Sequence, residues 1–106
     1  MITAGTRIKG MLGFAMRAGK LVIGTDMVCK TIAKANGGIK LVVIAGKASD
    51  ATRKKLSCKC DFYKLPSIEI DMTPEELGAL LGKTYAPAAV GVADEGFAKE
   101  ITIASK

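Results

Sequence analysis

The sequence predicts an α/β fold, built as an α/β/α three-layer sandwich with helices on both faces of a small mixed sheet of about four strands. Segments with apolar residues three and four positions apart, the period of a helix, alternate along the chain with short apolar runs of strand length. Apolar residues make up 49% of the chain but aromatic residues only 5%, so we expect a core of aliphatic side chains. A length of 106 residues fits a single domain spanning 1–106.

The N-terminal part predicts a helix followed by a short strand. Apolar residues recur at helical spacing between about Thr6 and Ala18, and Gly19 is expected to end this helix. Within it, Gly10 and Gly13 are expected to let a neighbouring element approach closely. The apolar triplet 21–23 then predicts a short buried strand.

A second helix and a central strand follow. Thr25 is the candidate N-cap of a helix that runs to about Ala35, and residues 36–38, Asn-Gly-Gly, are expected to end it. The unbroken run Leu41–Ala45 predicts a central strand that is covered on both faces.

The second half of the chain predicts two more helix and strand pairs and a last helix. Ser49 or Asp50 caps a helix that extends to about Cys60, and the alternating residues 66–70 predict an edge strand.

The helix after this edge strand has a complete start signal. Thr73 is followed by Pro74 at the first helical position and by Glu76 three residues after the cap. Gly82 is expected to end that helix. A small apolar run over 88–93 predicts the last strand, and Asp94 is expected to cap a final helix.

Composition narrows the class of function. The chain has no histidine, which removes the usual general base of catalytic triads. The three cysteines, Cys29, Cys58 and Cys60, form no CxxC pair, so we expect reduced thiols in a cytoplasmic protein, no bound metal and no cofactor. Cys58 and Cys60 diverge on a helix, which predicts one surface thiol and one core thiol. The longest apolar run is too short to cross a membrane.

Charge is distributed unevenly. Residues 1–64 hold 13 Lys and Arg against 3 Asp and Glu, a balance of +10, whereas residues 65–106 hold 3 against 7, a balance of −4. The sum of these balances is the net charge of +6. This asymmetry indicates a basic face for a polyanion, and the alternative is surface charge that only keeps the protein soluble.

The turn at Gly24 and Thr25 is the strongest candidate binding feature. A helix that starts after a glycine leaves the backbone N–H groups of its first turn unpaired at a partly positive end. Such an end attracts phosphate. The alternative is that these residues form an ordinary strand-to-helix turn.

Four stretches of the chain resemble the kink-turn RNA-binding superfamily of ribosomal protein L-seven-A-e, and most closely its small bacterial YlxQ-like branch. They lie in register over about residues 6–101 and comprise Leu12–Gly24, Lys40–Ala45, Pro74–Gly78 with Leu81–Lys83, and Val90–Ala98. The resemblance implies a protein that binds structured RNA where a duplex bends sharply beside tandem sheared G·A pairs. Ribosomal RNA is among the candidate partners.

The resemblance also implies which residues contact RNA. In the family, the start of the helix after the first strand enters the bent groove, and the loop before the last strand lies under an unstacked nucleotide. Carried over by position, the helix residues are Gly24, Thr25, Asp26, Met27 and Lys30. The loop residues are Tyr85, Ala86, Pro87, Ala88 and Ala89.

Side-chain chemistry adds lysines and identifies two departures from the family motif. Lys30 can donate to guanine O6 or N7, and Lys20 and Lys34 are further candidates for RNA contact. Asp26 stands where the family has Asn, and it can only accept hydrogen bonds. Met27 replaces a Glu. Either these two residues read a different base pattern, for example cytosine N4 for Asp26, or they only start the helix and pack.

RNA binding without catalysis is therefore the leading hypothesis. The departures at Asp26 and Met27 favour an alternative, a protein-interaction or assembly module that keeps the fold without reading bases. A nucleotide-binding enzyme is a third hypothesis, but the chain lacks both GxxxxGK[ST] and GxGxxG after a strand.

Overall fold

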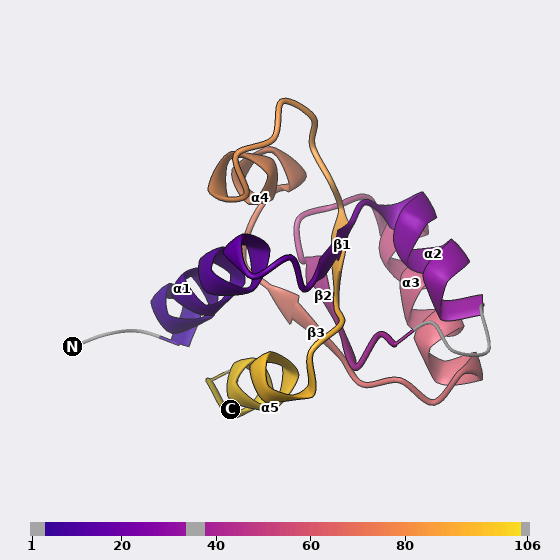
Figure 1. The fold of residues 1–106 in the computed structure, drawn as a ribbon. Coiled ribbons are helices and arrows are strands. Elements are labelled where there is room, and N and C mark those ends of the chain that lie inside the picture. The colour runs from indigo at the N-terminus through magenta and orange to yellow at the C-terminus, as the bar shows by residue number, and fades with distance from the viewer. Residues whose placement is uncertain (1–3, 34–37, 105–106) are drawn as a thin grey trace.

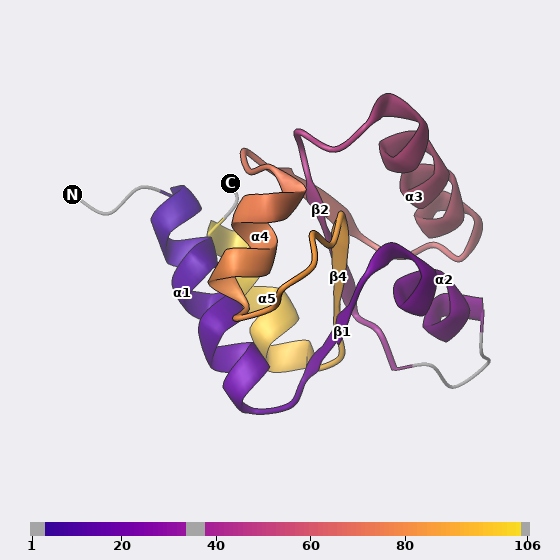
Figure 2. The same cartoon turned by 90° about the horizontal axis from the view of Figure 1, so that it is seen from above.

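The computed structural model describes residues 4–33 and 38–104 and confirms the three-layer α/β/α fold. Helices α1, α4 and α5 cover one face of the sheet, and α2 and α3 cover the other (Figures 1 and 2). In chain order the elements are α1 (Ala4–Arg17), β1 (Leu21–Ile23), α2 (Thr25–Ala33), β2 (Leu41–Ala45), α3 (Asp50–Phe62), β3 (Ser67–Ile70), α4 (Pro74–Leu80), β4 (Ala89–Val92) and α5 (Glu95–Ala104).

The sheet is mixed and has the strand order β1-β4-β2-β3. Strand β4 is antiparallel to both β1 and β2, whereas β2 and β3 are parallel. Strands β1, β2 and β3 therefore run in one direction and end at the same edge, where β4 begins and where α2, α3 and α4 start. We call this the helix-start edge, made of residues 23–25, 45–50, 70–74 and 85–89. The other end of the strands is the opposite edge.

Burial follows the position of each strand in the sheet. All five residues of β2 are buried, which confirms a central strand covered on both faces. The prediction of a buried strand over 21–23 was wrong, because β1 is an edge strand with one neighbour and its residues are only half-buried. Strand β3 is the other edge strand of the sheet, as predicted.

Two hydrophobic clusters lie on the two faces of the sheet. Leu41, Val43 and Ala45 of β2 pack with α1, α4 and α5, whereas Val42 and Ile44 pack with α2 and α3. This alternation follows from the period of two in a strand.

The thiols of α3 differ as the sequence predicts. Cys58 is exposed and Cys60 is buried. Burial raises the pKa of the Cys60 thiol by removing water from around it, and nearby Asp61 raises it further.

Three of the predicted caps are present. Thr73 and Glu76 form a reciprocal capping box, since Thr73 Oγ1 accepts from Glu76 N–H and Glu76 Oε1 accepts from Thr73 N–H, each at 3.0 Å. These hydrogen bonds hold the pKa of Glu76 below its usual value. Ser49, rather than Asp50, caps α3 by accepting from Thr52 N–H at 3.3 Å. Asp94 caps α5.

The predicted cap at Thr25 was wrong. Helix α2 includes Thr25, and the carbonyl of Gly24 accepts the first helical hydrogen bond from Val28 N–H at 2.9 Å. The residue whose carbonyl takes that bond is the N-cap, so the cap is Gly24. The predicted end of this helix falls partly on residues 34–37, which lie outside the described residues.

The two glycines of α1 do not have the packing role that the sequence suggested. A Cβ placed on Gly10 or Gly13 would have nothing within 4 Å apart from their own helix and chain neighbours. No neighbouring element therefore approaches the helix at these positions.

The difference between the two helix starts can be tested with a matched pair of threonine substitutions. Thr73→Ala removes a side-chain cap and should lower the free energy of unfolding by about 1 kcal/mol. Thr25→Ala replaces a residue inside the first turn and should change that free energy by less than about 0.5 kcal/mol. Urea denaturation followed by circular dichroism measures both values. An equal loss for both variants would show that Thr25 caps α2 after all.

Candidate functional site

The start of α2 presents unpaired backbone donors at the helix-start edge. The N–H of Gly24 donates to the carbonyl of Ala89 at 3.0 Å, which ties the end of β1 to the start of β4. Among the described residues, the N–H groups of Thr25, Asp26 and Met27 donate no hydrogen bond. Asp26 is exposed and Met27 is 54% exposed, so a partner can reach this turn. The site therefore offers several donors and the positive end of a helix dipole.

The loop that precedes β4 exposes fewer side chains than the sequence suggested. Tyr85 is 52% exposed and Ala86 is also exposed, but Pro87 and Ala89 are buried and Ala88 is half-buried. The side chains of Pro87 and Ala89 are therefore not accessible to a partner, and contact with RNA through this loop stays a prediction for Tyr85, Ala86 and Ala88. The physical reason is that the backbone here already belongs to the sheet. The carbonyl of Ala89 accepts from Gly24 N–H, and the carbonyl of Ala88 accepts from Ala45 N–H at 2.8 Å.

A glycine in α4 lets this loop lie against the helix. A Cβ at Gly78 would overlap the carbonyl oxygen of Tyr85 and would stand 3.1 Å from Cδ of Pro87. Gly78 is buried, and the atom that the Cβ would meet first belongs to the backbone rather than to the end of a flexible side chain. This close approach sets the position of Tyr85 relative to α2.

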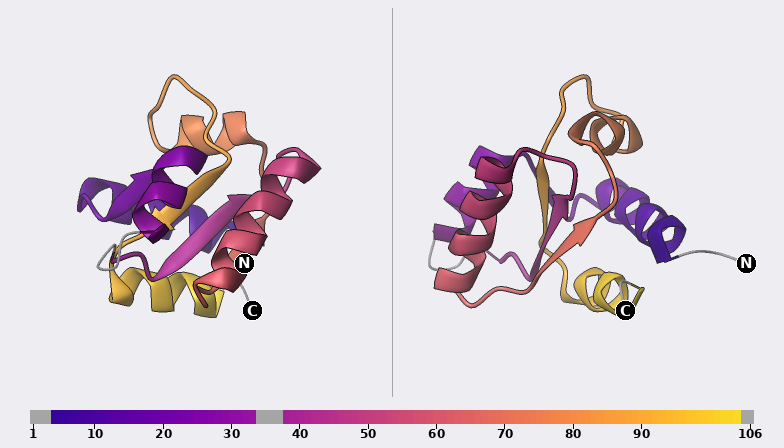
Figure 3. Two further views of the ribbon diagram at one scale, coloured as in Figure 1. Left: turned by 90° about the vertical axis from the view of Figure 1, so that its right-hand side faces the viewer. Right: turned by 180° about the vertical axis from the view of Figure 1, so that it is seen from behind.

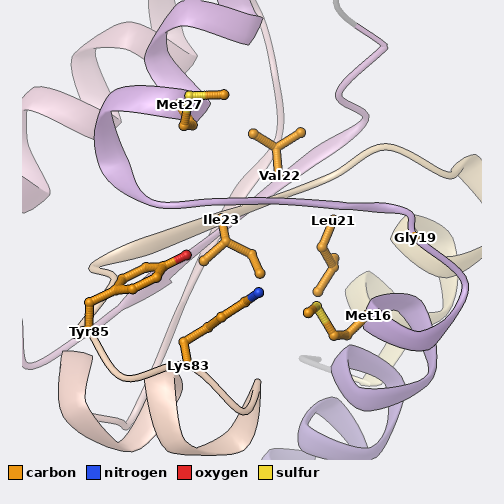
Figure 4. Close-up of a pocket in the computed structure, with 8 residues that line it drawn as sticks. All are labelled: Met16, Gly19, Leu21, Val22, Ile23, Met27, Lys83 and Tyr85. Atoms are coloured by element: carbon orange, nitrogen blue, oxygen red, sulfur yellow. The ribbon is translucent and has the colours of Figure 1, made fainter.

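An open hollow of about 390 Å³ lies between α1, β1, the start of α2 and the loop after α4. Figure 4 shows Lys83 and Tyr85 pointing toward Ile23 on one side of β1, with Val22 and Met27 on the other side. Its walls are mainly aliphatic, and Lys83 and Tyr85 add a cation and a phenol hydroxyl. Such a surface suits a planar apolar group that carries hydrogen-bond acceptors. The lining residues are Met16, Gly19, Leu21, Val22, Ile23, Met27, Lys83 and Tyr85.

The predicted lysines do not all lie at this site. Lys30 is exposed on α2, little more than one turn from the helix start. Lys20 lies at the other end of β1, about 13 Å from Gly24 for strand geometry, so it does not join the helix start. Lys34 lies outside the described residues. Lys83 was missed because only the fold brings it near β1, although it belongs to one of the four family-like stretches.

Other classes of site are not evident in the described residues. They contain no group of three His, Cys, Asp or Glu side chains that could hold a metal ion. Nor does the described part of the chain contain a helix that is both long enough and apolar enough to cross a membrane.

This arrangement defines a class of three-layer α/β/α protein. In it, the starts of α2, α3 and α4 lie at one edge of the sheet, beside the loop that carries Tyr85. The chain belongs to the ribosomal protein L7Ae/L30e/S12e/Gadd45 family, whose model matches residues 6–102.

Similar proteins are known in bacteria and archaea. The chain is 41% identical over 91 residues to RNA-binding protein YlxQ of Bacillus subtilis, covering 86% of this chain and 87% of that protein. It is 38% identical over 99 residues to RNA-binding protein YlxQ of Enterococcus faecium, covering 91% and 90%. Large ribosomal subunit protein eL30 of Methanocaldococcus jannaschii is 29% identical over 92 residues, covering 87% and 82%. These relatives are named as RNA-binding or ribosomal proteins.

Solved structures show the same fold. A protein of unknown function from Bacillus halodurans C superposes with a TM-score of 0.81 at 32% identity, covering 92% of this chain and 95% of that one. The Giardia lamblia 15.5kD RNA binding protein has a TM-score of 0.75 at 14% identity, covering 95% and 83%. The second likeness supports the fold alone.

The role of Gly78 in placing the loop can be tested with two glycine substitutions. Gly78→Ala should lower the free energy of unfolding by about 1–3 kcal/mol, because the new methyl group collides with backbone. Gly13→Ala should raise it by up to about 1 kcal/mol, since the position is helical and has open space. Thermal or urea unfolding measures both changes. A neutral Gly78→Ala variant would show that the loop can move away from α4 at no cost.

Proposed function

We propose that this protein binds RNA and recognises a kink-turn, or a related sharply bent element, through the start of α2. The observation that carries the proposal is the exposed turn at Thr25, Asp26 and Met27, whose N–H groups have no partner among the described residues. The RNA-binding and ribosomal relatives support RNA as the partner.

A bent duplex would make the bases accessible to this turn. The major groove of regular A-form RNA is too deep and narrow for side chains, and a sharp bend opens it. The start of α2 then enters the groove, with its free N–H groups directed at phosphates or base edges. Lys30, on the following turn, donates to guanine O6 or N7 or to a phosphate.

The hollow beside Tyr85 provides a second contact. A nucleotide unstacked at the bend places its base on Tyr85 and Ala86, and the aliphatic walls formed by β1 and Met27 exclude water from its face. Lys83 lies in the same hollow and balances the charge of the adjacent phosphate. Aromatic stacking and a nearby cation are the usual means by which proteins hold unpaired RNA bases.

Asp26 and Met27 adapt the site to its own RNA. Asp26 is exposed and accepts hydrogen bonds only, so it pairs with the amino group of cytosine or the N–H groups on guanine's Watson–Crick edge. The positive end of α2 offsets its negative charge beside phosphates. Met27 contributes an apolar contact instead of a hydrogen bond.

The role of Lys30 can be tested against a lysine on the other face of the molecule. Lys30→Ala should weaken binding to a kink-turn RNA about 10-fold, because one charge-assisted contact to a base or phosphate is lost. Lys99→Ala on α5 removes the same charge and should change binding less than about 2-fold at fixed salt. Gel-shift titrations of both variants and the wild type measure the effect.

Selectivity for the bend is tested with a second RNA in which the tandem G·A pairs are replaced by Watson–Crick pairs. The wild type should bind the kink-turn more tightly, and binding should weaken steeply as salt rises. Equal and weak binding to both RNAs would contradict recognition of the bend. If a partner protein then still co-purified after nuclease treatment, the protein-interaction alternative would be favoured.

A further inference from the structure

The end of α3 carries two exposed aromatic side chains that the proposed site does not use. Phe62 is 79% exposed and Tyr63 is 40% exposed. Their ring centroids lie 5.0 Å apart at an interplanar angle of 72°, an edge-to-face pair. Because Phe62 is this exposed, the fold of this chain does not account for a large apolar side chain there.

Several lysines lie close to the aromatic pair in the sequence. Lys55, Lys59 and Phe62 are spaced by four and three residues, so they lie along one face of the helix. The Nζ atom of Lys59 lies 5.9 Å from the centre of the Tyr63 ring. Residues 54–64 contain four Lys and one Asp. No described ion pair involves any of these lysines, so their charges are available to a partner.

This surface is separate from the helix-start edge. Helix α3 begins beside the helix-start edge and ends at the opposite edge (Figures 1 and 3). Its 13 residues extend about 20 Å. A ligand held at the start of α2 therefore reaches Phe62 only if it continues along the face formed by α2 and α3.

We propose that the α3 terminal surface, made of Lys55, Lys59, Phe62, Tyr63 and Lys64, binds a single-stranded RNA segment that flanks the bent element. Bases stack on the two rings, and the lysines contact the phosphates on either side. This combination of aromatic faces and unpaired cations is typical of surfaces that bind single strands with little sequence preference. The inference rests on the proposed function, because it extends the same RNA beyond its bend.

Charge favours RNA over a protein as the occupant. Lysines are depleted in the core of protein interfaces, whereas here Lys59 lies over the Tyr63 ring and Lys64 follows Tyr63 in the chain. An unpaired strand supplies both a π-face for each ring and a negative charge for each lysine.

The test compares a kink-turn RNA with and without a single-stranded tail of about ten adenosines, placed at either end in turn. Fluorescence anisotropy measures the affinity of each RNA for the full-length protein. The wild type should bind one tailed RNA about 10-fold or more tightly than the untailed RNA. Phe62→Ala should remove most of this gain, since the loss of one stacked base weakens binding about 5- to 150-fold.

A matched aromatic control and a second RNA keep the outcomes distinct. Phe14→Ala removes another exposed ring with a neighbouring cation, Arg17, on α1, and it should leave the gain unchanged. The ten-adenosine strand alone should bind the wild type weakly and Phe62→Ala more weakly still. This second arm decides the inference even if the kink-turn itself is not recognised.

Failure of the inference and failure of the proposed function give different results. If the tailed and untailed RNAs bind equally, or if Phe62→Ala keeps the full gain, the α3 terminal surface does not bind a strand, whatever happens at the bend. Suppose that a protein co-purifies with the wild type after nuclease treatment but not with Phe62→Ala, while binding to the tail is unchanged. That result would also overturn the inference and assign the surface to protein contact. Loss of discrimination between kinked and regular duplexes would contradict only the proposed function.

Discussion

The hydrogen bond from Gly24 N–H to the carbonyl of Ala89 is the contact on which the helix-start edge depends. It forms after β1 has ended and before α2 begins, and it requires Gly24 to adopt a φ of +102°, which other residues rarely adopt. The same contact fixes the first residue of β4. The start of α2 is therefore tied to the start of β4, the strand that follows the loop at Tyr85.

Sheet direction and packing then determine what this edge can do. Because β1, β2 and β3 run the same way, the positive ends of α2, α3 and α4 lie at one edge. The two hydrophobic clusters hold α2 and α3 against one face of the sheet and α1, α4 and α5 against the other. The helices that start at the helix-start edge are therefore packed firmly on the sheet. The basic N-terminal part supplies α2 and α3, where it can add affinity that depends little on base sequence.

Local signals predicted the fold well, and long-range contacts explain the errors. The capping box of Thr73 was predictable because all its atoms belong to residues close in sequence. The cap of α2 was not: the Gly24 carbonyl accepts the first helical bond, while the Gly24 N–H pairs with Ala89, which is far along the chain. The burial of Pro87 likewise depends on how closely Gly78 lets the loop approach α4. The strand over residues 21–23 was predicted with its observed bounds, and its extended geometry is what separates Lys20 from the helix start.

The most direct test of the account is a titration of the nitrogen-15-labelled protein with kink-turn RNA, followed by NMR of the backbone amides. The account predicts that the amide signals of Thr25, Asp26 and Met27 shift strongly as RNA is added. Their N–H groups should also exchange more slowly with solvent in the complex. Tight RNA binding that leaves these three amides unchanged would contradict the account, because the RNA would then lie on another surface.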